Sequence, residues 1–393
     1  MQFHKKTESH YFFLQPHQPF FLLAFINAII AMLIFMLSYK GITNLEIPAS
    51  NFHGYSMLYL FFTPAFVAFL FTTFPRFTST PPIEKKRYMQ VFGLYCLGTM
   101  LFLFGSIISP LFSYTGMLIL FIGHVMVFNI LQNIYRNSAM ADNHDIFWIL
   151  TAMGFGLLSH FIFIVGSLFY APMINVALEA GIYLYIFPLT FSVAQRMVPF
   201  FSHCMVEKNL SLLKIIFTLL LLHVIIESIH TNGSFIVDII LAYIMGKEIL
   251  RWNLPFPNPN PLLWILHLAL YWIPVALIFG AMTNLTTLIA GTNFLFLDIH
   301  ILMLGFVFTI LIGFGTRVTI GHSGNIMQVG MWEKVLFNWT QLVVIVRLFV
   351  SLAAAFGWNF MIFFDISVTV WIIMFTLWAI RFFAVLIYGK RLA

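Results

Sequence analysis

The stretch DIHILMLGFVFTILIGFGTRVTIGHSG, residues 298–324, decides the fold. It is almost uncharged, with His300 near its start and His322 near its end. At about 1.5 Å rise per residue, a continuous helix separates these histidines by about 33 Å, which is one hydrocarbon thickness. We therefore expect one spanning helix with an imidazole at each membrane face, both turned toward one side. Small residues that would let a neighbouring helix approach closely lie along it. They are Gly305, Thr309, Gly313 and Thr316.

The composition extends this interpretation to the whole chain. Hydrophobic residues make up 61% of the 393 residues, charged residues 8%, and the mean hydropathy is +0.98. A soluble domain could not bury so much apolar surface, so the sequence predicts an all-α, polytopic membrane helix bundle. The net charge of +6 is not gathered into a basic run of the kind that binds nucleic acid.

Apolar stretches of about 20 residues predict about twelve transmembrane helices in a single integral membrane domain, 1–393. Residues 1–19 are expected to form a cytoplasmic tail, with His4, His10 and His17 in solvent. No sequence repeat relates the two six-span halves. The predicted spans are 20–39, 52–74, 89–108, 114–135, 146–169, 173–196, 211–229, 234–250, 262–282, 297–320, 333–356 and 364–388.

Lysine and arginine are distributed unevenly between the predicted loops. They gather in the loops after the even-numbered spans and at the two termini, whereas the opposite loops hold only Lys40. Because basic loops stay in the cytoplasm, both termini are predicted to be cytoplasmic. This places His53 and His300 at the outer face and His322 at the inner face.

Histidine is the main clue to chemistry, since thirteen accompany very few charged residues. An imidazole inside a spanning helix is costly and is a common ligand of haem iron and copper. His124 and His160 lie at equal depth on consecutive spans, so they could be the two axial ligands of one haem, or only polar contacts between helices. His223 is expected to be structural. Arg347, in a span, needs a partner, with Glu179 or a haem propionate as candidates.

Other sites are excluded by the sequence. Phosphate-binding glycine loops, CxxC, HExxH and GxSxG are all absent, which argues against a nucleotide-driven pump and against a hydrolase. Cys96 and Cys204 are expected at different depths, as two free thiols.

The opening stretch fits the pattern H-x4-G-x7-G-x3-R-x3-G-H-[ST]-G, from His300 to Gly324. This pattern resembles the NnrS family of bacterial membrane proteins. The resemblance implies haem and copper cofactors and protection against nitric oxide. Phe52-His53-Gly54-Tyr55-Ser56-Met57-Leu58 is similar to the family's W-H-A-H-E-M-L, with Tyr55 and Ser56 in place of its second His and its Glu.

Three further stretches extend the resemblance. The run around His267 is similar to the family's P-L-x-W-x-L-H-x-x-Y-x-W, and that around Arg196 to G-G-R-I-I-P-F-F-T. Gln18 stands where the family's G-F-R-P-F-F has its Arg. We predict metal ligands among His53, Met57, His267, His300 and His322, with His53 and His300 at one depth and His267 and His322 at the other. The predicted cofactor-binding residues are His53, His124, His160, His267, His300, His322, Arg196 and Arg317, the arginines holding propionates.

The sequence therefore predicts a multi-pass protein of the bacterial inner membrane. It is expected to bind haem, of the b type, or haem and copper, and to bind or convert nitric oxide. No catalytic residue and no oligomeric state are predicted. Two alternatives remain open: a twelve-span secondary transporter, and a non-catalytic haem-binding sensor or assembly protein. Few intramembrane charges and a short link between the halves count against the transporter.

Overall fold

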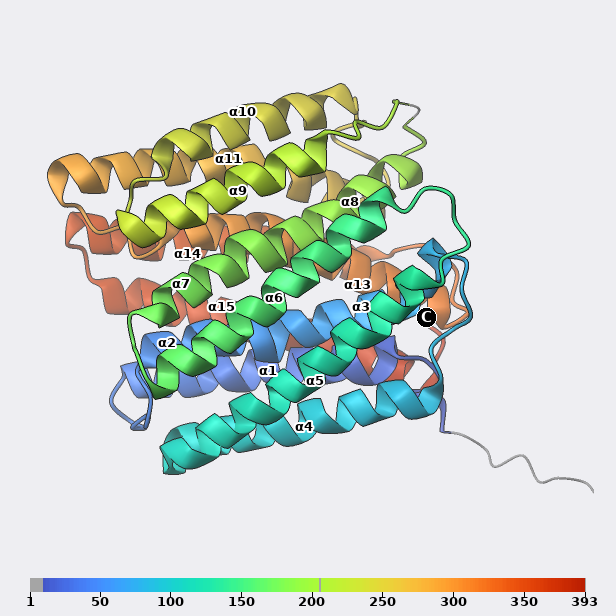
Figure 1. Cartoon of the computed structure of the whole chain (residues 1–393), viewed down its shortest axis with the longest axis horizontal. Helices are drawn as coiled ribbons and strands as arrows, with labels where there is room; N and C mark the ends of the chain where they lie inside the picture. The colour runs from blue at the N-terminus through green and yellow to red at the C-terminus, as the bar shows by residue number, and fades with distance from the viewer. Residues whose placement is uncertain (1–9, 205, 393) are drawn as a thin grey trace, which may run out of the picture.

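The computed structural model describes residues 10–204 and 206–392, and within these residues every regular element is a helix. Figure 1 shows the helices running roughly antiparallel along the long axis of one bundle. The predicted polytopic helix bundle is therefore confirmed. His4 lies outside the described residues.

The helices follow one another with short connections. Their bounds are η1 (Tyr11–Phe13), α1 (His17–Tyr39), α2 (Ala49–Tyr55), η2 (Ser56–Phe62), α3 (Thr63–Phe77), α4 (Lys85–Ile108), α5 (Pro110–Arg136), α6 (His144–Leu168), α7 (Met173–Ala180), η3 (Gly181–Ile186), α8 (Phe187–Phe201), α9 (Leu212–Ile229), α10 (Phe235–Arg251), α11 (Pro261–Ala290), α12 (Leu297–His300), η4 (Ile301–Phe308), α13 (Thr309–His322), α14 (Met331–Phe356) and α15 (Phe360–Tyr388).

A helix lies at each of the twelve predicted ranges, and in the described part of the chain eleven are long and apolar enough to cross a membrane. The twelfth range is α10, which has 17 residues and carries Asp238, Lys247, Glu248 and Arg251. Proline and glycine set several boundaries. Pro110 begins α5, where its missing N–H costs nothing, and Gly357 ends α14 with φ +69°, a conformation that glycine adopts readily.

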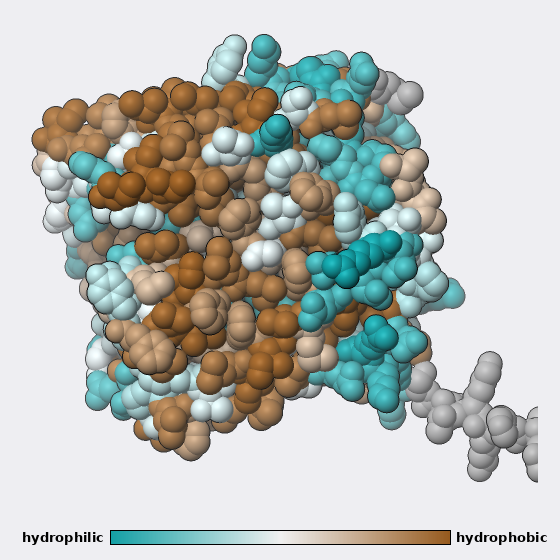
Figure 2. Space-filling view, viewed as in Figure 1, coloured by the Kyte–Doolittle hydropathy of each residue, from teal (hydrophilic) through white to brown (hydrophobic). Residues whose placement is uncertain are grey.

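The bundle has two ends, which we name by the chain termini. Tyr11 lies against Gly389, so the starts of η1 and α1 and the end of α15 share one end, the termini end. The opposite end carries the starts of α2, α10 and α12 (Figure 1). Figure 2 shows apolar residues over the middle of the visible face and hydrophilic residues gathered at the termini end, as expected for helices surrounded by lipid.

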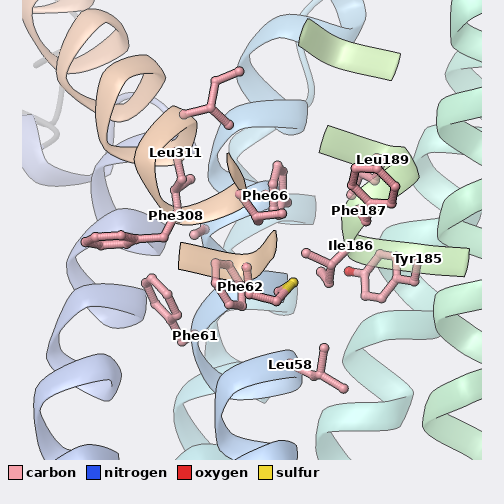
Figure 3. Close-up of a cluster of buried hydrophobic side chains, with 14 of the residues drawn as sticks. Leu58, Phe61, Phe62, Phe66, Tyr185, Ile186, Phe187, Leu189, Phe308 and Leu311 are labelled. Atoms are coloured by element: carbon pink, nitrogen blue, oxygen red, sulfur yellow. The ribbon is translucent and has the colours of Figure 1, made fainter. Parts of the chain in front are cut away.

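Three spans form the centre of the bundle, and each contains a π-helical segment. The segments are η2, η3 and η4, in the second, sixth and tenth spans, so they recur every fourth span. Among the eleven helices long enough to cross a membrane, the three that contain these segments are the most buried. In their most apolar stretch, 89%, 83% and 78% of the residues are buried. Figure 3 shows Phe62, Ile186 and Phe308 from these segments in one apolar cluster. The structure thus has a four-helix periodicity that the sequence does not reveal.

Threonine side chains close two of these segments. A π-helix bonds i to i+5 and leaves carbonyls without their usual partner at its end. The hydroxyl of Thr63 donates to the carbonyl of Leu58 at 2.7 Å, and that of Thr309 to the carbonyl of Leu304 at 2.8 Å. The hydroxyls thereby supply hydrogen bonds to backbone groups that have no access to water.

The π segment η4 changes one prediction. A uniform α-helix would turn His300 and His322 toward one side, but a π segment turns less per residue and so rotates everything after it. His300 accordingly faces residues of α2 and α14, whereas His322 faces Gln15 and α1.

Candidate metal centre

The opposite end of the bundle brings His53 and His300 together. The two imidazole rings lie 8° from parallel, with centroids 6.2 Å apart. His53 begins the second span in α2, and His300 ends α12 just before η4. On its other face, the ring of His53 stacks against Phe35 with centroids 4.6 Å apart. Two histidines from distant parts of the sequence therefore form one half-buried pair.

Arg347 of α14 holds the segment that carries His300. Its guanidinium donates to the carbonyl of Leu295 at 2.8 Å and to the hydroxyl of Ser351 at 2.6 Å. It also lies 3.1 Å from Nδ1 of His300, not against Glu179 as one prediction had it. Nδ1 of His300 is 2.7 Å from the carbonyl oxygen of Phe296, which requires an Nδ1–H. This tautomer leaves Nε2 of His300 with a free lone pair.

One feature of the pair fits a bound metal ion. Nδ1 of His53 is buried and has no hydrogen-bond partner in the described structure, which is costly unless something binds there. A metal ion binds an imidazole through a lone pair in the plane of the ring, so the two stacked rings would have to turn toward each other to share one ion. Met57, four residues after His53 in η2, stays a predicted ligand, whose soft sulfur would suit copper.

A second imidazole pair lies at the termini end. His17 is 2% exposed, not in solvent as predicted, and its ring centroid is 5.1 Å from that of His322. Nδ1 of His322 is 2.7 Å from Oε1 of Gln15, and Nδ1 of His17 is buried without a partner among residues 10–204 and 206–392. His17 was not predicted as a site residue because it precedes the first apolar run. The sequence did hold one indication, because Pro19-Phe20-Phe21 next to it match the end of the family's G-F-R-P-F-F stretch.

His267 does not join His322. Its Nδ1 donates to the carbonyl of Pro255 at 3.0 Å, and its Nε2 accepts from the hydroxyl of Ser202 at 2.7 Å. Both ring nitrogens are therefore occupied, which is the arrangement of a buried structural histidine. The predicted pairing of His267 with His322 is not what the structure forms.

His124 and His160 meet directly. Their Nδ1 atoms are 3.4 Å apart, and Nε2 of His160 is hydrogen-bonded to the hydroxyl of Tyr55 at 2.8 Å. The ring of Tyr59 stacks on His160 with centroids 3.9 Å apart. Equal depth did bring the two histidines together, but this direct contact leaves no space for a macrocycle between their rings. They form part of a buried hydrogen-bonded network.

The two arginines predicted to hold propionates have protein partners at the termini end. Arg196 lies 3.5 Å from the buried carboxylate of Asp145 and over the ring of Phe77. Arg317 lies over the ring of Phe201, 3.9 Å from its centroid. Lys208 also contacts Asp145 at 2.8 Å. Asp145 therefore has two cationic partners within the protein.

An ion-pair network joins the loop before α6 to the segment before α9. Lys208 lies 3.1 Å from Asp142, in the loop before α6. There the backbone N–H of His144 donates to Asp142 and, with Lys208, holds the pKa of this carboxyl below its usual value. A pocket of about 460 Å³ lies among these groups, lined by Arg196, Lys208, Arg251, Asp145, Glu248 and Trp252.

Within residues 10–204 and 206–392, no group of three or more His, Cys, Asp and Glu side chains is placed to hold a metal ion. The candidate centres are therefore imidazole pairs. Such a pair is the ligand set of a haem with two axial histidines, or of copper when a thioether joins it. Cys96 and Cys204 are both free, as predicted.

The sequence matches the model of one protein family, described as NnrS protein, over residues 11–389. The chain belongs to the NnrS family. No curated protein matches the sequence. Because the match covers nearly the whole chain, it includes both the His53–His300 pair and the His17–His322 pair. NnrS membership supports a role in nitric oxide stress.

Proposed function

We propose that this NnrS protein protects bacteria against nitric oxide by binding or converting it at a metal centre held by His53 and His300. The main supporting observation is that His53 and His300, from the second and tenth spans, lie side by side, and that Nδ1 of His53 is buried without a hydrogen-bond partner in the described structure. The metal is haem iron, of the b type, or copper, and would supply the redox-active position at which nitric oxide binds. The protein would lie in the bacterial inner membrane.

The residues around the pair support this assignment. Donation from Nδ1 of His300 to the carbonyl of Phe296 leaves Nε2 as the ligand atom, which is how metal-bound histidines are commonly oriented. Arg347 fixes the same segment through the carbonyl of Leu295. Phe35 covers the other face of His53 and excludes water from it. These contacts hold both imidazoles in a preorganised, low-dielectric position.

The test begins with the full-length protein purified from cells supplied with haem and copper. Optical and electron paramagnetic resonance spectra are recorded for the oxidised, reduced and nitric-oxide-treated states, together with metal content. We expect a haem or copper signal that changes on addition of nitric oxide. A protein containing neither metal, with no spectral response, would overturn the proposal.

A second experiment separates the alternatives. A sensor or assembly protein would lose its metal in His300→Ala but keep full nitric oxide resistance in cells. A protein that acts through the centre would lose both. A transporter would instead take up a substrate into liposomes along an ion gradient, with rates that do not depend on His53 or His300.

A further inference from the structure

A buried imidazole between two carboxylates lies near the opposite end of the bundle, apart from the His53–His300 pair. His223 of α9 is 2% exposed. Its Nδ1 is 2.7 Å from Oδ1 of Asp238 of α10, and its Nε2 is 3.8 Å from Oε2 of Glu179 of α7. We call Glu179, His223 and Asp238 the His223 triad. The sequence predicted a structural role for His223, because it lies in an apolar run with no family motif around it.

The geometry favours a proton on Nε2 of His223 or on Oε2 of Glu179. Nδ1 must carry a hydrogen, since it lies at hydrogen-bond distance from a carboxylate that also accepts from the hydroxyl of Ser234 at 3.1 Å. If His223 were neutral, Nε2 would face Oε2 of Glu179 with a lone pair opposite a negative charge. That Oε2 is buried and has no hydrogen bond in the described structure. The repulsion is removed when a proton lies either on Nε2 or on Oε2.

The charges around the triad favour the same conclusion. The ring of Tyr183 of η3 lies 4.0 Å from that of His223. Four carboxylates are close enough to interact electrostatically with Tyr183: Glu179, Glu227 of α9, Asp238 and Asp298 of α12. The cationic groups of this region are His223 and Arg347 of α14, which acts on Asp298. If every group were ionised, two negative charges would be unbalanced in a buried region, which is costly inside a membrane.

Glu227 already has hydrogen-bond donors for its carboxylate. Its carboxylate accepts from the backbone N–H groups of Asn232 at 2.7 Å and Ser234 at 3.0 Å, beside the start of α10. Two backbone donors and a helix N-terminus stabilise the ionised form. In the described structure Oε2 of Glu179 has no such donor, and the side chain is 24% exposed, so Glu179 is the member of the triad that is both unpaired and accessible.

We propose that the His223 triad is a buried proton-binding site, in which Nε2 of His223 and Oε2 of Glu179 share one exchangeable proton and Asp238 fixes the imidazole. The site lies beside the candidate centre, since the hydroxyl of Tyr183 donates to Asp298 at 3.4 Å, two residues before His300. It needs no metal, so it is independent of the proposed function.

The experiment is infrared spectroscopy of the full-length protein in lipid membranes, recording the spectral change between high and low pH. The variants are Glu179→Gln and His223→Gln. Glu46→Gln is the matched control, because Glu46 is an exposed glutamate in a loop at the same end. Each sample is measured as purified and again after removal of metals. The result for the His223 triad can then be judged even if the proposed metal centre is wrong.

We expect the wild type to show a titrating carboxyl and imidazole signal that is at least about five-fold smaller in Glu179→Gln and His223→Gln. Glu46→Gln should retain it. Spectra of Glu179→Gln that match the wild type, or an equal loss in Glu46→Gln, would overturn the proposal. If Glu179→Gln does not fold, Glu179→Asp is measured instead, because it keeps the charge but shortens the side chain. Its titrating signal should shift, and an unshifted signal would also count against the site.

Discussion

The imidazole rings of His53 and His300 lie nearly parallel, with centroids 6.2 Å apart, although the two residues belong to the second and tenth spans. His300 directly precedes the π-helical segment η4, and His53 lies within one turn of the start of η2. Such segments are often found at functional sites, because the extra residue re-aims the side chains around it. The pair is therefore set by two irregular central spans that pack against each other.

Replacing either member of this pair should remove the metal. We expect His53→Ala and His300→Ala to weaken metal binding by at least about 100-fold, because a ligand is lost rather than a supporting contact. Metal content and optical spectra of the purified variants check this. His230→Ala is the control, since His230 is exposed at the same end. A His300→Ala protein with full metal content would place the centre elsewhere.

His267→Ala should act on stability and leave the metal in place. Its removal takes a hydrogen-bond partner from the hydroxyl of Ser202 and from the carbonyl of Pro255 in a part-buried site. The expected loss in free energy of unfolding is about 1–3 kcal/mol. Denaturation in detergent, followed by circular dichroism, measures it. Loss of metal at unchanged stability would instead make His267 a ligand, as the sequence predicted.

Arg347→Met should disturb the centre without removing a ligand. The guanidinium fixes the carbonyl of Leu295 and lies against Nδ1 of His300, so its loss frees the segment that orients the imidazole. We expect metal affinity to fall about 10–100-fold, as when other outer-shell partners are lost. Arg347→Lys should not restore it, because an ammonium cannot reproduce the planar fork. Recovery in Arg347→Lys would show that charge alone matters.

Two glycine substitutions test whether α4 and α5 pack in close contact. A side chain at Gly116 of α5 would meet the carbonyl of Gly98 of α4 at 2.8 Å, whereas one at Gly93 of α4 would meet nothing within 4 Å. Gly116→Ala should therefore push α4 and α5 apart and lower the free energy of unfolding by about 1–3 kcal/mol. Gly93→Ala should be neutral or stabilising, since alanine favours a helix. Equal effects would contradict the close contact.

The termini end illustrates what the sequence could not predict. His322 was found from its motif, but its partner was expected to be His267, because both lay at similar depth. Depth is a coordinate along the membrane normal and says nothing about which helices are neighbours. The structure places α1 beside α13, so His17 becomes the partner, and His267 bonds to Ser202 and Pro255 instead. The same limitation hid the carboxylates around His223.

By itself, the sequence determined the class of fold, twelve helical ranges that the structure also contains, the family, and the equal depth of His53 with His300 and of His124 with His160. Those properties follow from hydrophobicity and rise per residue, which act locally along the chain. Only the tertiary structure decided which helices touch, which imidazoles pair, and where Arg347 and Glu179 find their partners. Side-chain pairing depends on helix neighbours and rotation, and the three π segments alter that rotation in a way that no uniform helical period can anticipate.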